Sequence, residues 1–198
     1  MTFTPDQSQL NALKTWNDKG DSTRHAALGL AGEAGELIEL FKKNEYKPGF
    51  DWWNCKHCGQ IENCGKLNNS CPGYTPLILD ELGDYSYYLR ILAYQKEVSF
   101  EELCKIEWEY DGDMLWLLGQ LASDSTYLLT EWIEHKGISK DILYFCTRNF
   151  LAILSKLDTT LDVVLDLNYK KLNSEPSNHG WHNAKMKTID DCPPMNPK

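Results

Sequence analysis

Apolar residues recur at helical spacing along most of the chain, and this periodicity constrains the fold more than any other feature. The stretch from Ser22 to Lys43 carries them in the pattern of a buried helical face. Further helices are predicted over residues 4–17, 76–92, 99–110, 112–136, 140–156 and 159–172. No run alternates apolar and polar residues for long enough to form a sheet. The sequence therefore predicts an all-α helical bundle.

Length, composition and charge narrow the class of protein. With 198 residues, 42% of them hydrophobic, we expect a single domain over residues 1–198. No segment is apolar enough to span a membrane and the N-terminus lacks a signal-peptide pattern, so a cytoplasmic location is expected. The 20 basic and 29 acidic residues give a net charge of -9, which disfavours nucleic-acid polymers and anionic membranes as partners. The proline-bearing residues 174–198 are expected to form a tail.

The helical pattern breaks over residues 47–75, where glycine, proline and cysteine predict a loop-like insertion. Four cysteines in the spacing C-x2-C-x5-C-x6-C are candidate zinc ligands: Cys55, Cys58, Cys64 and Cys71. In a reducing compartment clustered cysteines bind metal more often than they form disulfides, so we expect a structural Zn²⁺ that staples the insertion. His57 could replace one cysteine. Reduced cysteines without a ligand, disulfides and an iron–sulfur cluster are the alternatives.

Two acidic pairs lie inside apolar helical stretches. Glu33 and Glu36 share one face of a predicted helix, and Glu81 and Asp84 share one face of the next. Two like-charged pairs on facing helices repel each other unless a cation lies between them. Carboxylate ligands of this kind suit Mg²⁺ or Mn²⁺, so the two pairs predict a divalent metal site. The alternative interpretation is that the acids form a solvated surface without a metal.

The residues around these acids resemble a known family. Residues 30–43 (LAGEAGELIELFKK) and 80–85 (DELGDY) are similar to the two metal-binding helices of the MazG-like all-α nucleoside triphosphate pyrophosphatases. Their common feature is ExxE on one helix followed by ExxD on the next. Residues 167–172 (LNYKKL) loosely resemble the closing helix of that family.

The resemblance implies Mg²⁺-dependent hydrolysis of a nucleoside triphosphate, ribo- or deoxyribo-, to the monophosphate and pyrophosphate. The implied metal-binding and catalytic residues are Glu33, Glu36, Glu81 and Asp84. The implied phosphate or sugar contacts are Lys42, Lys43, Asn168 and Lys171. The family commonly forms dimers or tetramers, so the alternatives are a homo-oligomer and a chain in which an internal repeat replaces one of those interfaces. The alternative is a zinc-bearing helical interaction module that kept the fold and lost catalysis.

An internal repeat is also visible, because residues 30–38 align with 121–129, residues 89–93 with 151–155 and residues 99–103 with 161–165. Either the chain is a duplication that folds like a fused dimer, or two amphipathic helices simply align this well. In this alignment the second half lacks the acidic pairs, and the first half lacks counterparts of Asn168 and Lys171. A duplication therefore predicts one composite site per chain, with metal ligands from the first half and phosphate or sugar contacts from the second.

Overall fold

The computed structural model describes residues 4–16, 20–57, 59, 75–105 and 112–174, and in these residues every regular element is a helix. The helices are α1 (Pro5–Thr15), α2 (Ser22–Tyr46), α3 (Leu77–Gln95), α4 (Phe100–Cys104), α5 (Met114–His135), α6 (Lys140–Lys156) and α7 (Leu161–Ser174). The predicted all-α fold is confirmed. None of these helices is long and apolar enough to cross a lipid bilayer.

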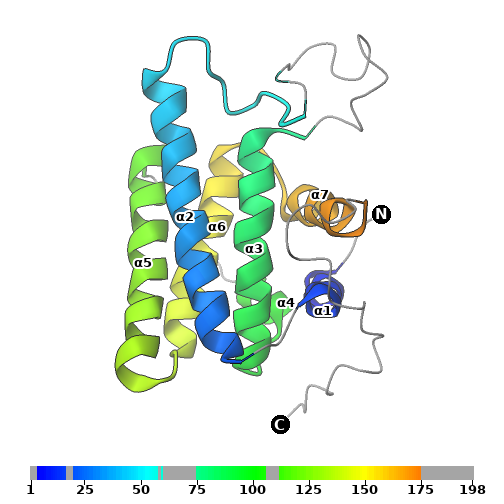
Figure 1. Ribbon diagram of the computed structural model, residues 1–198, viewed down its shortest axis with the longest axis vertical. Helices are drawn as coiled ribbons and strands as arrows, with labels where there is room; N and C mark the ends of the chain where they lie inside the picture. The colour runs from blue at the N-terminus through cyan, green and yellow to red at the C-terminus, as the bar shows by residue number, and fades with distance from the viewer. Residues whose placement is uncertain (1–3, 17–19, 58, 60–74, 106–111, 175–198) are drawn as a thin grey trace.

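Helix α3 is the centre of the fold. In Figure 1, α2, α3, α5 and α6 stand side by side, and α1, α4 and α7 lie on the other side of α3. Helix α2 packs against α3 and α5, helix α5 packs against α6, and helices α1 and α7 pack against α3. Because α3 has neighbours on nearly every side, most of its residues are buried, including polar ones such as Ser86 and Arg90.

Short polar side chains set where most helices begin. The Thr4 side chain accepts the Gln7 N–H and the Gln7 side chain bonds back to Thr4, which is the capping box that suits a helix with proline at its first position. Ser99 likewise accepts the Glu102 N–H at 3.2 Å, as the sequence predicts. Each cap satisfies a backbone donor that the first helical turn leaves without an intrahelical partner.

Three helix ends differ from the prediction by three residues or more. Helix α2 continues to Tyr46, α3 continues to Gln95, and α4 ends at Cys104 rather than near Tyr110. The N–H of Lys105 donates to the Glu102 carbonyl at 3.2 Å, a tight three-residue bond of the kind that closes a helix. A capping box marks only the start of a helix, so the sequence carried no signal for this early end.

The described part of the insertion caps helix α3. The residue before the helix is Pro76, which makes no side-chain capping bond. Instead, the N–H of Leu77 donates to the Asn54 carbonyl at 3.0 Å, and the N–H of Ile78 donates to the Trp52 carbonyl at 3.1 Å. Backbone carbonyls from the insertion therefore satisfy the donors that a capping side chain satisfies elsewhere.

The base of the insertion is closed by a short antiparallel bridge between Cys55 and Pro76. Within it the N–H of Lys56 donates to the Thr75 carbonyl at 2.9 Å, and the Cys55 side chain is buried. Parts of two sequence predictions lie outside the described residues, namely the zinc ligands Cys58, Cys64 and Cys71, and residues 175–198 of the tail.

A glycine allows α2 and α3 to approach closely. A Cβ atom at Gly29 would lie 2.2 Å from the Cε1 atom of the Tyr88 ring. The Tyr88 ring is buried and meets the Trp16 ring edge-on, with 6.3 Å between the ring centroids, so it has little room to move aside. The ring therefore lies against the α2 backbone one helical turn before Glu33.

We expect Gly29→Ala to lower the free energy of unfolding by about 1–3 kcal/mol, because the added methyl group overlaps the Tyr88 ring. The matched control is Gly119→Ala in α5, where the added Cβ has nothing within 4 Å. That change should raise stability by about 0.5–1 kcal/mol through helix propensity alone. Urea unfolding measures both. A Gly29→Ala protein as stable as the control would contradict this packing of Tyr88.

Candidate functional site

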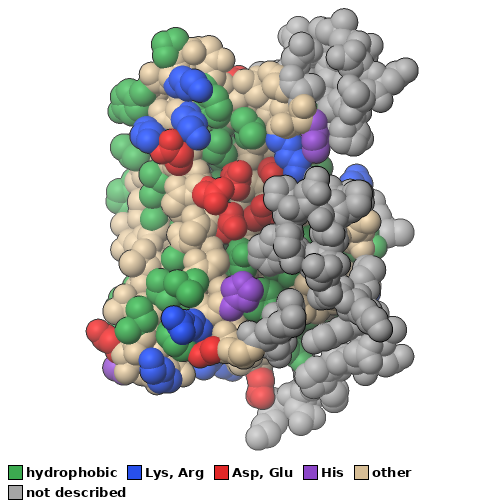
Figure 2. Space-filling view, viewed as in Figure 1, with side chains coloured by type: hydrophobic (Ala, Val, Ile, Leu, Met, Phe, Trp, Pro, Cys, Tyr) green, Lys and Arg blue, Asp and Glu red, His purple; other side chains and the backbone are tan. Residues whose placement is uncertain are grey.

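Three glutamates from α2 and α3 converge on one point. Side-chain oxygens of Glu33, Glu36 and Glu81 all lie within 4.8 Å of one another. The three-residue spacing puts the first two on one face of α2, and the packing of α2 on α3 brings Glu81 opposite them. Figure 2 shows acidic side chains gathered where these two helices meet. Oxygen atoms at this separation fit around one hard divalent cation.

The surroundings of this cluster oppose its negative charge. Burial raises the pKa of Glu33 to about 8, and the nearby Asp84 and Glu36 add to the effect. Burial also raises the pKa of Glu81 to about 7, again with contributions from Glu36 and Asp84. Without a cation, Glu33 therefore holds a proton at neutral pH and Glu81 does so part of the time. A divalent ion would replace those protons.

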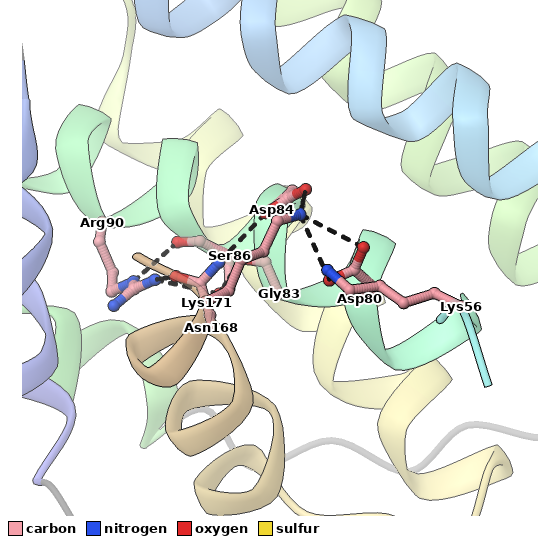
Figure 3. A network of polar contacts seen from close by, with 8 residues as sticks. All are labelled: Lys56, Asp80, Gly83, Asp84, Ser86, Arg90, Asn168 and Lys171. Carbon is pink, nitrogen blue, oxygen red and sulfur yellow. Dashed lines mark hydrogen bonds and ion pairs between the residues drawn. The ribbon is translucent and has the colours of Figure 1, made fainter. Parts of the chain in front are cut away.

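The fourth predicted ligand, Asp84, faces α7 instead (Figure 3). Its Oδ1 atom accepts a hydrogen bond from Nδ2 of Asn168 at 3.2 Å, and its Oδ2 atom pairs with the Lys171 ammonium group. Asp84 does not belong to the set of three converging carboxylates. The structure thus brings Asn168 and Lys171, predicted from the end of the helical sequence, into direct contact with one of the acids.

The charges of this contact are strongly coupled. Burial raises the pKa of Asp84, although the Lys171 ammonium opposes the rise. Burial by itself would lower the pKa of Lys171, but Asp84 and Asp80 outweigh it and raise that pKa. Lys171 is therefore a permanent cation beside the glutamate cluster.

A buried arginine fixes the orientation of Asn168. Arg90 is 1% exposed, and its guanidinium donates to the Ser8 carbonyl at 3.0 Å, the Ser86 carbonyl at 3.1 Å and Oδ1 of Asn168 at 2.6 Å. Because a guanidinium has donors only, Asn168 turns its carbonyl oxygen toward Arg90 and its NH₂ group toward Asp84. Burial lowers the pKa of Arg90 to about 10, which still leaves it charged at neutral pH.

Sequence reasoning assigned no role to two further members of this network, Asp80 and Lys56. The Lys56 ammonium lies 3.0 Å from Oδ1 of Asp80, and the Lys171 ammonium lies 3.3 Å from the same oxygen. The four-residue spacing of Asp80 and Asp84, which puts both on one helical face, was a usable signal. Lys56 comes from the insertion, where no periodicity points to its position.

The two lysines predicted near the end of α2 pair with a different acid. Lys42 contacts Glu39, and the Lys43 ammonium, four residues from Glu39 on the same helix, lies 3.7 Å from the same carboxylate. The hydrogen bond from Lys42 lowers the pKa of Glu39. The Lys42 and Lys43 side chains are 60% and 40% exposed. Their predicted contact with phosphate stays a prediction.

No protein-family model, curated protein or solved structure matches the chain. The functional assignment therefore depends on the side chains themselves. Three carboxyl groups that face one another, with a lysine and an amide fixed beside them, can hold a divalent cation and bind an anionic ligand next to it.

The raised pKa values of Glu33 and Glu81 predict how pH and Mg²⁺ affect stability. Both folded-state values lie above the ordinary value of 4.5, so the metal-free folded protein holds these protons more tightly than the unfolded chain. Their effect is to lower stability as pH rises from about 4.5 to about 8. Mg²⁺ should therefore raise the melting temperature more at pH 8.5 than at pH 5.5, as measured by differential scanning fluorimetry. Equal Mg²⁺ effects at both pH values, or an undiminished effect in Glu33→Gln, would contradict the assignment.

Proposed function

We propose that the protein is a Mg²⁺-dependent nucleoside triphosphate pyrophosphohydrolase, as the resemblance to the MazG-like family implies. The observation that carries the proposal is the convergence of Glu33, Glu36 and Glu81 on one point. The contact of Asp84 with Asn168 and Lys171 supports it, because amide and ammonium donors suit a phosphorylated ligand. The cofactor is Mg²⁺, for which Mn²⁺ can substitute.

The three glutamates would hold the metal, with Asp84 at the edge of the site toward α7. A divalent cation bound there supplies charge neutralisation for the triphosphate, polarisation of a phosphoryl oxygen and acidification of a water. One of the four carboxylates would also accept the proton of the attacking water.

The reaction balances without a further reactant. The water oxygen forms a bond to the α-phosphorus, and the bond from that phosphorus to the oxygen bridging toward the β-phosphorus breaks. Pyrophosphate leaves with the electron pair of the broken bond, and the water proton passes to the carboxylate. Lys171, with its pKa held high by Asp84 and Asp80, would bind phosphate oxygens as a point charge.

The internal repeat belongs to the same proposal. The α2–α3 pair corresponds to the α5–α6 pair, and α4 corresponds to α7. Helix α4, from the first half, packs against α6, whereas helix α7, from the second half, packs against α3. Such reciprocal packing is what a fused dimer would show, and it supports one composite site per chain, with Asn168 and Lys171 contributed by the second half.

Pyrophosphate release from a panel of ribo- and deoxyribonucleoside triphosphates, with Mg²⁺ and then with EDTA, tests the function. We expect release with Mg²⁺ only, and a loss of about 100-fold or more in kcat/KM for both Glu33→Gln and Glu81→Gln. Glu39→Gln is the matched control, because Glu39 lies on the same helix but pairs with Lys42 and Lys43.

Mg²⁺ binding without release from any nucleotide would overturn the proposed reaction and favour the interaction module. A Glu39→Gln protein as inactive as Glu33→Gln would mean that general damage to α2, rather than loss of the metal ligands, explains the result.

A structural zinc site in the insertion is proposed alongside the reaction, with Cys55 as one ligand. Plasma emission spectrometry should find about one zinc per chain in the purified protein, as a four-cysteine site requires. Cys55→Ser should lose the zinc, whereas Cys146→Ser, a change to a buried cysteine of α6, should keep it. Full zinc occupancy in Cys55→Ser would remove that residue from the site.

A further inference from the structure

Lys56 is the one described lysine of the insertion that reaches the acidic network. Its ammonium lies 3.0 Å from Oδ1 of Asp80, and the two side chains are only 16% and 13% exposed. Lys171, from α7, shares that same carboxylate oxygen at 3.3 Å. Figure 3 shows the two lysines meeting Asp80 from different sides. Two positive charges from distant parts of the sequence are thus held side by side.

The backbone around Lys56 is fixed. The Lys56 N–H donates to the Thr75 carbonyl at 2.9 Å, directly beside the bridge between Cys55 and Pro76. The preceding residues cap the first turn of α3 through backbone hydrogen bonds. The insertion therefore holds the backbone of Lys56 at a defined place beside the N-terminal end of α3.

The two lysines border the glutamate cluster at one end. Asp80 precedes Glu81 directly and lies one helical turn before Asp84. Lys56, which pairs with Asp80, therefore stands on the N-terminal side of the metal-binding acids, and Lys171, which pairs with both Asp80 and Asp84, stands beside them. At the other end, one turn beyond Asp84, the Tyr88 ring closes against Gly29. A polyanion that binds the metal and continues along α3 toward its N-terminus would meet Lys171 and then Lys56.

Charge explains how the lysines become available to a ligand. In the metal-free protein, Asp80 and Asp84 attract both ammonium groups. A divalent cation bound at the glutamates would offset two of their negative charges, so the same ammonium groups could share their donors with anionic oxygens. Three N–H donors on each ammonium group allow one to stay on Asp80 while another reaches a phosphate.

We propose that Lys56, together with Lys171, binds the pyrophosphate end of the substrate, so that the cysteine-bearing insertion takes part in substrate recognition. This inference rests on the proposed hydrolysis, because it assigns an end of the triphosphate to these lysines. The competing interpretation is a purely structural ion pair that ties the insertion to α3. Product inhibition separates the two interpretations. Loss of a purely structural ion pair would change the inhibition constants of pyrophosphate and of the nucleoside monophosphate to the same extent, or change neither.

The experiment compares inhibition by inorganic pyrophosphate with inhibition by the nucleoside monophosphate, both with Mg²⁺ present. In Lys56→Gln the inhibition constant for pyrophosphate should rise about 10-fold or more, as expected when a charge-assisted hydrogen bond is lost. The constant for the monophosphate should stay unchanged, and Lys56→Arg should restore most of the pyrophosphate inhibition. Lys47→Gln is the control, because the Lys47 ammonium lies over the Phe50 ring at 5.8 Å instead of on an acid.

Equal changes in the two inhibition constants, or a change in neither, would overturn the role of Lys56. If the unmodified protein hydrolyses no nucleotide, the proposed function fails. The role of Lys56 is then tested separately by calorimetric titration of the protein, with Mg²⁺ present, with inorganic pyrophosphate. A loss of about 10-fold in pyrophosphate affinity in Lys56→Gln then supports the site. Equal affinity of the two proteins, including no binding by either, overturns it.

Discussion

Repulsion between carboxyl groups packed along the line where α2 meets α3 is the constraint on which the rest of the structure depends. Glu33, Glu36 and Glu81 face one another, and Asp80 and Asp84 extend the acidic face of α3. Glu36 is exposed, but Glu33, Glu81, Asp80 and Asp84 are partly withdrawn from water, so protons or cations must compensate for their charges. The protein meets this need partly by itself, since α7 and the insertion each bring one lysine to the acidic face.

The buried charge of Arg90 fixes the orientation of the Asn168 side chain on α7. Arg90 has no carboxylate partner among the bonds that fix it, and its donors go to two backbone carbonyls and to Asn168. The amide of Asn168 then has only one orientation that satisfies both Arg90 and Asp84. The buried guanidinium of Arg90 thus determines which atom of the Asn168 side chain faces the acidic site, although the two residues are 78 positions apart in the sequence.

Much of the fold followed from periodicity and caps, and the shared face of Glu33 and Glu36 followed from their spacing. Helix starts at Pro5 and Phe100 are set by local bonds that sequence displays, and Glu33 and Glu36 must share a face wherever a helix forms. The rest depends on contacts between distant segments. Nothing local shows that Asp84 turns toward α7 instead of the glutamates, or that Lys56 reaches Asp80 from a segment without periodicity.

The cap that the insertion places on α3 has a consequence for how this chain can vary. The helix has no capping side-chain hydrogen bond of its own, so its first turn depends on the backbone carbonyls of Trp52 and Asn54. Beyond that base the chain leaves and returns at two fixed points, and the entropy of closing such a loop rises by only about 0.6 kcal/mol for each doubling of its length. A change in the length of the insertion should therefore cost little, provided that the base beside Pro76 and the proposed zinc ligands are kept. Residues 52–56 thus hold the start of α3, the helix that carries Glu81 and Asp84, in a way that does not depend on the length of the insertion.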